Sequence, residues 1–345
     1  MGEAKRRLDV AVRAGVEALG VETIGGRVQV RWSKGAAATP FGQMAFFIEF
    51  LNLTGLYRRW EDSCPLELKS SNGSKIRDIL GTLFLSVLSG HRRYAHITAL
   101  RADGVIPALL GMNGIVAEDT VRRALQTMDE AAGRSWLQTH LDASVLPLLW
   151  APWIMDIDVT VKPLYGKQVK GYEYAVLVTD LTHELCAIAQ LYRDRGDAEN
   201  AFDELKNQWG WGGFITHDLK RCQFTAMTVA LAYNWWSLFV RLAHPKARLE
   251  AIASRPFLLS GIGQLTTHAG QIHLAITALH GKAEKAKAIL MRVSRQLNDW
   301  KVTAEQLTSA SVWHRVCAFI MAAVTGLNWF ETRRNHALSH CITEP

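Results

Sequence analysis

The sequence predicts a mixed α/β protein that is predominantly helical. Apolar residues recur at helical spacing over long stretches, for example from Phe41 to Tyr57 and, interrupted at Gly90, from Lys75 to Leu100. Strand-like runs are confined to a short segment near the N-terminus and to a region between residues 153 and 191. Hydrophobic residues make up 49% and charged residues 21% of the 345 positions, which is typical of a globular protein. We therefore expect a sizeable core, with many of the 12 Trp residues among its anchors.

The first half of the chain begins with a predicted strand and continues as helices joined by loops. Val28–Trp32 alternates between apolar and polar residues, which is typical of a strand. Further along, Asp119 or Thr120 is expected to cap a helix. That helix would present Arg122 and Arg123 from its first turns.

The second half begins with strands and ends with helices. Its predicted elements are, in order, a strand at 153–161, a strand at 174–179, a candidate strand at 187–191 and a helix at 197–209. From Thr216 onward the pattern is mostly helical, with breaks at Pro245 and at Arg255-Pro256.

Charge and cysteine content favour a cytoplasmic protein with an anionic partner. The formal net charge is +7, from 39 Lys+Arg against 32 Asp+Glu, and a mild positive field of this kind favours nucleic acid. The five cysteines are scattered without zinc spacing, which is typical of reduced thiols. No apolar segment follows the N-terminal residues as in a signal peptide. The apolar runs Thr225–Ala243 and Val316–Phe330 are interpreted as buried helices rather than membrane spans, because the first contains polar residues and the second is too short.

Two carboxylates lie two residues apart on the first strand of the second half. Asp156 and Asp158 would therefore point to the same face. Carboxylates on an apolar strand are costly to bury without a cation or hydrogen-bond donors. The pair indicates either a metal site or a strand end that reaches water.

A stripe of polar residues is predicted on the helix near residue 200. It consists of Tyr192, Arg195, Glu199 and Lys206. An ideal helix places all four within a band about 60° wide, with Asp203 beside them. Such a stripe is ordinarily a solvated face. A carboxylate that a helix directs toward acidic strand residues also suits divalent cations in phosphodiester chemistry, with the neighbouring cations on phosphate oxygens.

The spacing Tyr192-x2-Arg195-x3-Glu199-x6-Lys206 resembles the Y-R-E-K signature of bacterial insertion-sequence DDE transposases. The resemblance implies that Glu199 is the last metal-binding carboxylate and that Tyr192, Arg195 and Lys206 contact transposon-end DNA. It also implies that Asp158, followed by a Thr two residues later, is the first carboxylate. The expected cofactor is Mg²⁺ or Mn²⁺, held by Asp158 and Glu199.

Further segments resemble characteristic sequence segments of one branch of these transposases. They are Gly90–His96, Glu118–Arg123 and Asn234–Trp236. Basic residues of the first two segments are expected to bind DNA as well: Arg92, Arg93, Arg122 and Arg123.

The resemblance implies an RNase H-like catalytic core flanked by helical regions, here in truncated form. The expected division is an N-terminal, mostly helical DNA-binding region at 1–150, a remnant of the DDE catalytic domain at 151–215 and a C-terminal helical region at 216–345. The implied reaction is cleavage and strand transfer at DNA ends. The implied partners are double-stranded DNA, as terminal inverted repeats and as target, and a second copy in a homodimer.

The chain departs from this family between its two carboxylates. Only 40 residues separate Asp158 from Glu199. Several further strands with their connections need on the order of 70 residues, so the strand that carries a second Asp does not fit. Asp180 and Asp156 are the candidate substitutes. We therefore expect strand transfer to be impaired.

Three interpretations remain open from the sequence. The chain is a transposase with Asp158 and Glu199 in a metal site, or a non-catalytic protein that occupies transposon ends and inhibits an intact enzyme, or a relic without function. An unrelated all-α scaffold would require the four-residue signature to be accidental.

Overall fold

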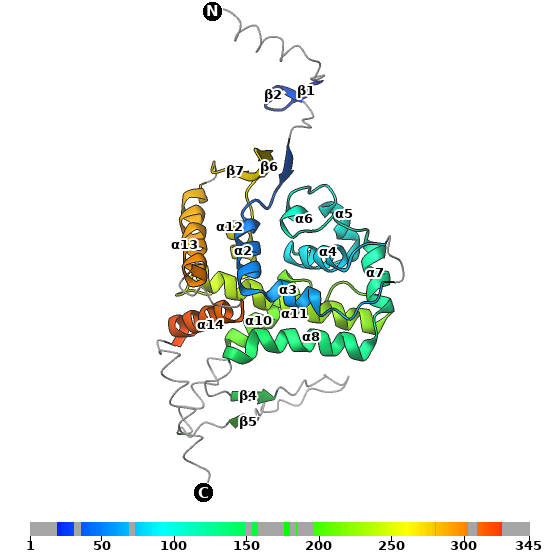
Figure 1. Ribbon diagram of the computed structural model, residues 1–345, viewed down its shortest axis with the longest axis vertical. Helices are drawn as coiled ribbons and strands as arrows, with labels where there is room; N and C mark the ends of the chain where they lie inside the picture. Colours follow the sequence, from blue (N-terminus) through cyan, green and yellow to red (C-terminus); the bar gives the residue numbers. More distant parts are fainter. Residues whose placement is uncertain are drawn as a thin grey trace, which may run out of the picture.

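In the part of the chain that the structure describes, the fold is a bundle of helices with three small antiparallel sheets at its periphery (Figure 1). The computed structural model describes residues 19–30, 36–68, 73–148, 154–157, 176–179, 184, 196–279, 281–302 and 309–325. The prediction of a mixed, predominantly helical protein is confirmed.

The α-helices are, in chain order, α2 (Met44–Thr54), α3 (Leu56–Asp62), α4 (Ile76–Leu88), α5 (Ile97–Leu100), α6 (Ile106–Leu109), α7 (Glu118–Thr127), α8 (Glu130–Val145), α10 (Gly196–Gln208), α11 (Leu219–Ala243), α12 (Ala251–Leu258), α13 (Ala283–Val302) and α14 (Ser309–Thr325). Two short 3-10 helices are η1 (Tyr94–His96) and η2 (Leu146–Leu148). The strands are β1 (Leu19–Thr23), β2 (Gly26–Val30), β3 (Ala37–Thr39), β4 (Ile154–Ile157), β5 (Val176–Thr179), β6 (Gly263–His268) and β7 (Gln271–Ile276).

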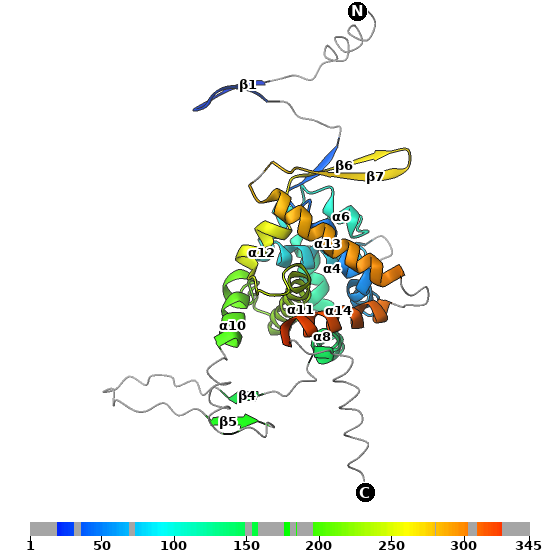
Figure 2. The same cartoon turned by 90° about the vertical axis from the view of Figure 1, so that its left-hand side faces the viewer.

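Helix α11 forms the centre of the bundle. It packs against α2, α4, α7, α8, α13 and α14, and α8 lies alongside it over much of its length (Figures 1 and 2). Trp235 of α11 meets the ring of Trp60 edge-on at 5.9 Å, and Trp60 in turn stacks on Trp136 at 5.5 Å. All three rings are buried, which confirms that tryptophans anchor the core.

The buried indole N–H groups of two core tryptophans form hydrogen bonds with neighbouring helices. The indole N–H of Trp235 donates to the hydroxyl of Ser144 at 3.0 Å, and that of Trp236 donates to Ser254 at 2.9 Å. One continuous cluster of buried side chains runs from α2 to α14. The helices of the predicted regions 1–150 and 216–345 therefore share a core, while the three-region boundaries stay a prediction.

The strands predicted at 153–161 and 174–179 are present, over shorter spans, as β4 and β5. They pair antiparallel, with Asp156 opposite Leu177. The candidate strand at 187–191 and the acidic residue Asp158 lie outside the described residues.

A β-hairpin in the C-terminal part is absent from the sequence-based prediction. Strands β6 and β7 are joined through Ala269 and Gly270, both of which have positive φ, as the tight two-residue turn requires. On its other side β6 pairs with β3, so Ala37 lies opposite Leu265. This pairing joins segments more than 200 positions apart, which no local pattern reveals.

Two predicted helix boundaries are wrong. Helix α7 begins at Glu118 with Ala117 at its N-cap, so neither Asp119 nor Thr120 caps it. Asp119 instead pairs with the two arginines one turn later. Pro256 lies inside α12 rather than breaking it, because the helix is anchored on both sides of the proline by tertiary contacts. The break at Pro245 is confirmed, since α11 ends at Ala243.

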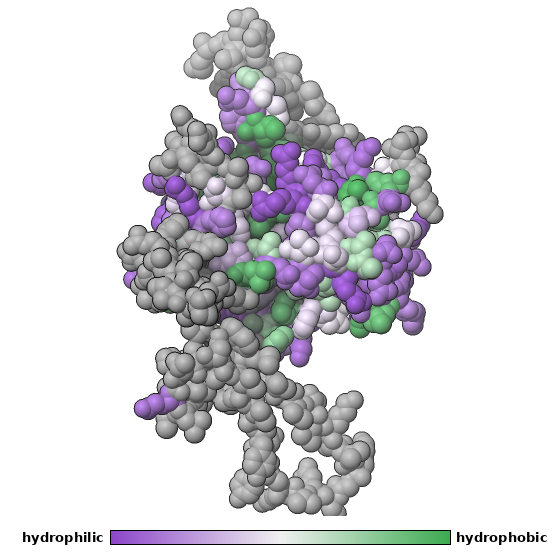
Figure 3. Space-filling model, turned by 60° about the horizontal axis from the view of Figure 1, so that its bottom comes forward, coloured by the Kyte–Doolittle hydropathy of each residue, from purple (hydrophilic) through white to green (hydrophobic). Residues whose placement is uncertain are grey.

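One face of the molecule is mostly polar. Figure 3 shows hydrophilic residues over much of one face, with separate hydrophobic patches between them. Among the described residues, no helix is long and apolar enough to cross a membrane.

Candidate functional site

Helix α10 carries part of the predicted signature and is fixed by a buried carboxylate. Glu204, only 3% exposed, accepts hydrogen bonds from the backbone N–H of Ala251 at 2.8 Å and from the Trp209 indole at 3.1 Å. It also forms an ion pair with Arg248 at 2.9 Å. Because Glu204 and its neighbour Leu205 face the core, the opposite side of α10 faces outward.

The predicted stripe on α10 is only partly described. Asp203 and Lys206 are exposed, as expected for it. Glu199 lies within α10, although its side chain is not among those described, and Tyr192 and Arg195 lie outside the described residues. Phe202, next to Asp203, is 52% exposed and stacks on Trp211 at 6.0 Å.

The C-terminal end of α10 is held by a partly buried arginine. Arg255 donates to the carbonyl of Gln208 at 2.6 Å, and its guanidinium lies 3.8 Å from the ring centroid of Trp209. Burial lowers the pKa of Arg255 to about 10, and the nearby carboxylate of Glu204 opposes this shift. The side chain therefore remains a cation at neutral pH and fixes the point where the chain leaves α10.

A glycine-rich loop follows α10 and presses against the loop that carries Arg92. The backbone N–H of Phe214 donates to the carbonyl of Arg92 at 2.6 Å, and the Arg92 guanidinium donates to the carbonyl of Asn207. A Cβ atom at Gly213 would lie 2.4 Å from the Arg92 carbonyl oxygen. The close approach of these two loops therefore requires glycine at this position.

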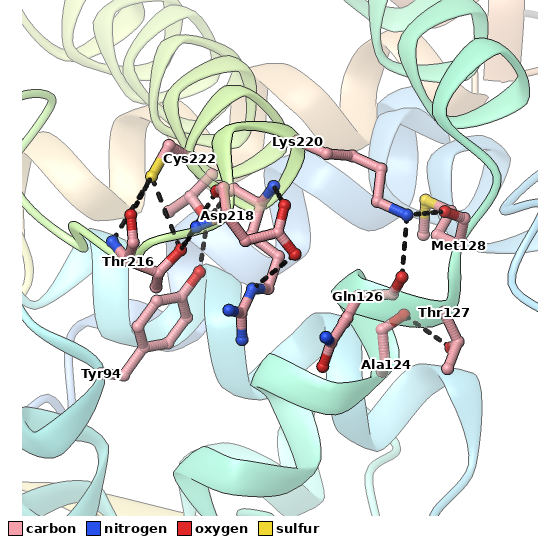
Figure 4. Close-up of polar contacts among 11 residues, drawn as sticks. Tyr94, Ala124, Gln126, Thr127, Met128, Thr216, Asp218, Lys220 and Cys222 are labelled. Carbon is pink, nitrogen blue, oxygen red and sulfur yellow. Dashed lines mark hydrogen bonds and ion pairs between the residues drawn. The ribbon is translucent and has the colours of Figure 1, made fainter.

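Helix α11 connects the segments around these loops (Figure 4). The hydroxyl of Tyr94 lies 2.6 Å from the hydroxyl of Thr225. The ammonium group of Lys220 donates to the carbonyls of Gln126 and Met128, both at 2.8 Å, and so satisfies acceptors at the C-terminal end of α7. The first turns of α11 thereby position both the Arg92 loop and α7.

These segments enclose a cavity of about 660 Å³. Its charged lining residues are Arg92, Arg93, Arg122, Lys206 and Glu118. We call this hollow the basic cavity, because four cations and a single carboxylate line it. Its remaining wall comes from Tyr94, Ala95 and the 210–216 loop. The structure therefore brings together four of the predicted DNA-binding residues from three separate segments.

The cations of the basic cavity differ in their pairing. Within the described part of the chain, Arg93 and Lys206 have no carboxylate partner. Arg122 pairs with Asp119 at 3.3 Å. Arg123 pairs with the same carboxylate at 3.9 Å and is not part of the cavity wall. A concave surface with unpaired cations is suited to an anionic ligand.

The acidic residues expected to hold a metal are only partly described. The backbone of Asp156 lies in β4, whereas Asp158 and Asp180 are outside the described residues. Among the side chains that the structure describes, no group of three His, Cys, Asp or Glu residues could hold an ion.

The sequence analysis predicted residues that line the basic cavity. It did not predict the residues that hold its walls in place. Glu204 and Arg255 read as ordinary surface charges in the sequence. The run Gly210, Gly212, Gly213 was interpreted only as a helix end, although clustered glycines also indicate close backbone approach.

The region around the basic cavity is similar to a known protein family. Residues 89–235 match the family model of the transposase DDE domain, and this segment contains every residue of the basic cavity. No curated protein and no solved structure matches the chain. Residues 89–235 of the chain are therefore similar to the transposase DDE domain.

Proposed function

We propose that this protein is an insertion-sequence transposase that binds the duplex ends of its element through the basic cavity. The observation that carries the proposal is the cavity itself, where Arg92, Arg93, Arg122 and Lys206 converge opposite one carboxylate. Guanidinium and ammonium groups of this kind neutralise the phosphate backbone, which supplies most of the affinity in DNA binding.

The cavity also relates DNA binding to the proposed chemistry. Lys206 and Glu199 lie on the same helix, roughly 10 Å apart along its axis at 1.5 Å per residue. DNA held at Lys206 would therefore pass close to Glu199. We propose Tyr192 and Arg195 as further contacts along the same stripe, and Arg123 as a phosphate contact outside the cavity.

The proposed metal site uses Asp158 and Glu199. Carboxylate oxygens are the ligands that Mg²⁺ and Mn²⁺ prefer, so the side chains of Asp158 and Glu199 are suitable ligands for such an ion. When bound, a divalent ion in this position would stabilise charge on the phosphate oxygens of the scissile bond. The chain's own residues bind and orient the DNA: the basic cavity holds the backbone, and α10, fixed by Glu204, sets the position of Glu199.

We further propose that cleavage is impaired in this protein. The short distance in sequence between Asp158 and Glu199 leaves no room for a strand with a second Asp. The direct pairing of β4 with β5 is in keeping with that deletion. The second candidate function follows from the same spacing: the protein would occupy transposon ends, as a dimer on paired ends, and inhibit an intact enzyme by competition.

Binding is tested by titrating a labelled duplex that carries the element's terminal inverted repeat. The Arg93→Gln/Lys206→Gln variant should lower the slope of log K against log salt by about 2, at roughly 0.9 per phosphate contact. The Arg58→Gln/Arg134→Gln variant loses the same charge outside the cavity and serves as the control. Equal slopes for the two variants would contradict the proposed site.

Cleavage is tested with the same duplex in Mg²⁺ and in Mn²⁺. We expect binding without end-specific nicking. Clear cleavage at the element's end that Glu199→Gln abolishes would show that the protein is an active transposase, and the impairment would have to be abandoned.

A further inference from the structure

A second cluster of cations lies on α13, far from the basic cavity. Between residues 282 and 295 there are five cations, Lys282, Lys285, Lys287, Arg292 and Arg295, against one carboxylate, Glu284. A second exposed carboxylate, Asp299, follows about one turn after Arg295 on the same side of α13, so the surface is predominantly but not wholly cationic. Glu284 lies 3.7 Å from Lys287, which leaves the other four cations without a carboxylate partner in the part of the chain that the structure describes. We call Lys282, Lys285, Arg292 and Arg295 the α13 patch.

The α13 patch is a coherent surface rather than a scattered set. On an ideal helix Lys285, Arg292 and Arg295 lie within about 80° of one another. All three are exposed, whereas the opposite side of α13 is buried against the core. Lys285 and Arg295 span about 15 Å along the helix at 1.5 Å per residue. Duplex DNA carries a charge for about every 1.7 Å of its axis, so this span covers several phosphates.

His244, which directly follows α11, lies close enough to the α13 patch for the charges of the patch to affect its pKa. His244 packs its ring against Phe257 at 5.8 Å, and its Nε2 atom is buried without a hydrogen-bond partner. Burial lowers the pKa of His244, and the charges of Lys285 and Arg292 lower it further. Uncompensated cations therefore meet where α13 crosses the end of α11, and Arg292 is fixed there by donating to the carbonyl of Ala243 at 2.6 Å.

The two basic surfaces lie at opposite ends of α11. Its first turns hold the wall of the basic cavity, and its last residue contacts Arg292. At 1.5 Å per residue, the 25 residues of α11 extend about 37 Å. Figure 1 accordingly shows α13 and α7 on opposite sides of the molecule. The same phosphates cannot reach both surfaces.

The chemistry of the patch favours nucleic acid over a lipid surface. A helix that lies in a membrane interface inserts its apolar side, but the apolar side of α13 is already in the core: Ala286, Leu290, Val293 and Leu297 are each at most 1% exposed, and only Met291 among the described large apolar residues of α13 is as much as 42% exposed. What remains outside is a row of cations on a rigid, anchored helix. Such a row contacts backbone phosphates without reading bases.

We propose that the α13 patch is a second, sequence-independent contact for the phosphate backbone of duplex DNA, separate from the basic cavity. This inference rests on the proposed function, because it assigns a further stretch of DNA to the same protein.

The test compares two duplexes of equal length, one with the terminal inverted repeat and one with a scrambled sequence. The Lys285→Gln/Arg295→Gln variant should lower the salt slope by about 2 on both duplexes. The cavity variant Arg93→Gln/Lys206→Gln should lower the slope as well, and should in addition reduce the preference for the repeat. Arg292 is left intact because it supports the end of α11.

The outcomes separate this inference from the proposed function. If the α13 variant matches the Arg58→Gln/Arg134→Gln control on both duplexes while the cavity variant weakens binding, the inference is overturned and the proposed function stands. A loss confined to the α13 variant supports the inference and contradicts the cavity. Unchanged DNA binding together with lost binding to anionic lipid vesicles would also overturn it. Wild-type protein that binds neither duplex would overturn both.

Discussion

The hydroxyl of Tyr94 and the hydroxyl of Thr225 hydrogen-bond across 2.6 Å in the core beneath the basic cavity. Tyr94 follows Arg92 and Arg93 directly, and Thr225 lies in the second turn of α11. The bond therefore ties the loop that presents two cations to α11, the central helix of the bundle. Burial raises the pKa of Tyr94, so the phenol stays neutral and available for this bond at physiological pH.

Tyr94→Phe should cost about 1 kcal/mol of unfolding free energy, the net value of one buried hydrogen bond. It should also weaken DNA binding, because the Arg92 loop loses its tie to α11. Urea unfolding and duplex titration measure the two effects. Thr225→Val and the double variant complete a cycle, and additive losses would show that the two hydroxyls do not interact.

Gly213→Ala should disrupt the basic cavity, because its Cβ would lie 2.4 Å from the carbonyl oxygen of Arg92. The two loops would have to separate, and we expect at least a tenfold loss of duplex affinity, equivalent to about 1.4 kcal/mol. Gly212→Ala is the matched control, since a Cβ there meets no atom within 4 Å. Equal affinities for the two variants would mean that the close approach of the loops does not matter for binding.

Much of the helical framework could be predicted from sequence because its signals are local. The apolar spacing of α4, the stop at Gly90 and the span of α10 all follow from periodicity and from glycine at helix ends. On the predicted stripe of α10, Lys206 is exposed, while the role of the stripe stays a prediction.

What the sequence could not predict depends on contacts between distant segments. Strand β3 pairs with β6 through residues that are far apart in the chain. The position of Pro256 inside α12 likewise depends on contacts with distant segments. The basic cavity is the same kind of feature. Arg92, Arg122 and Lys206 were each predicted to bind DNA, but only the packing of α7 and α10 around α11 places them at one surface.

Glu204→Ala should destabilise the protein by about 3–5 kcal/mol, because it leaves Arg248 and two N–H donors without their buried acceptor. Glu204→Gln keeps part of this network and should cost less. The control is Asp203→Asn on the exposed side of the same helix, which should change stability by no more than about 0.5 kcal/mol. Chemical denaturation ranks the three variants. If Glu204→Ala unfolds like Asp203→Asn, the carboxylate does not anchor α10.

Stability should fall as the pH drops from about 6.5 to 4. Burial lowers the pKa of His91 to about 4, with the charges of His96 and Arg255 acting in the same direction. Between these pH values the unfolded chain binds a proton that the folded protein does not, so falling pH stabilises the unfolded state relative to the native one. His140, whose pKa burial also lowers to about 4, adds to the same slope. His91→Gln should flatten the pH dependence of the unfolding midpoint, whereas His268→Gln on the exposed β6 strand should leave it unchanged. An identical slope in wild type and His91→Gln would mean that His91 is not held neutral by its place beneath the basic cavity.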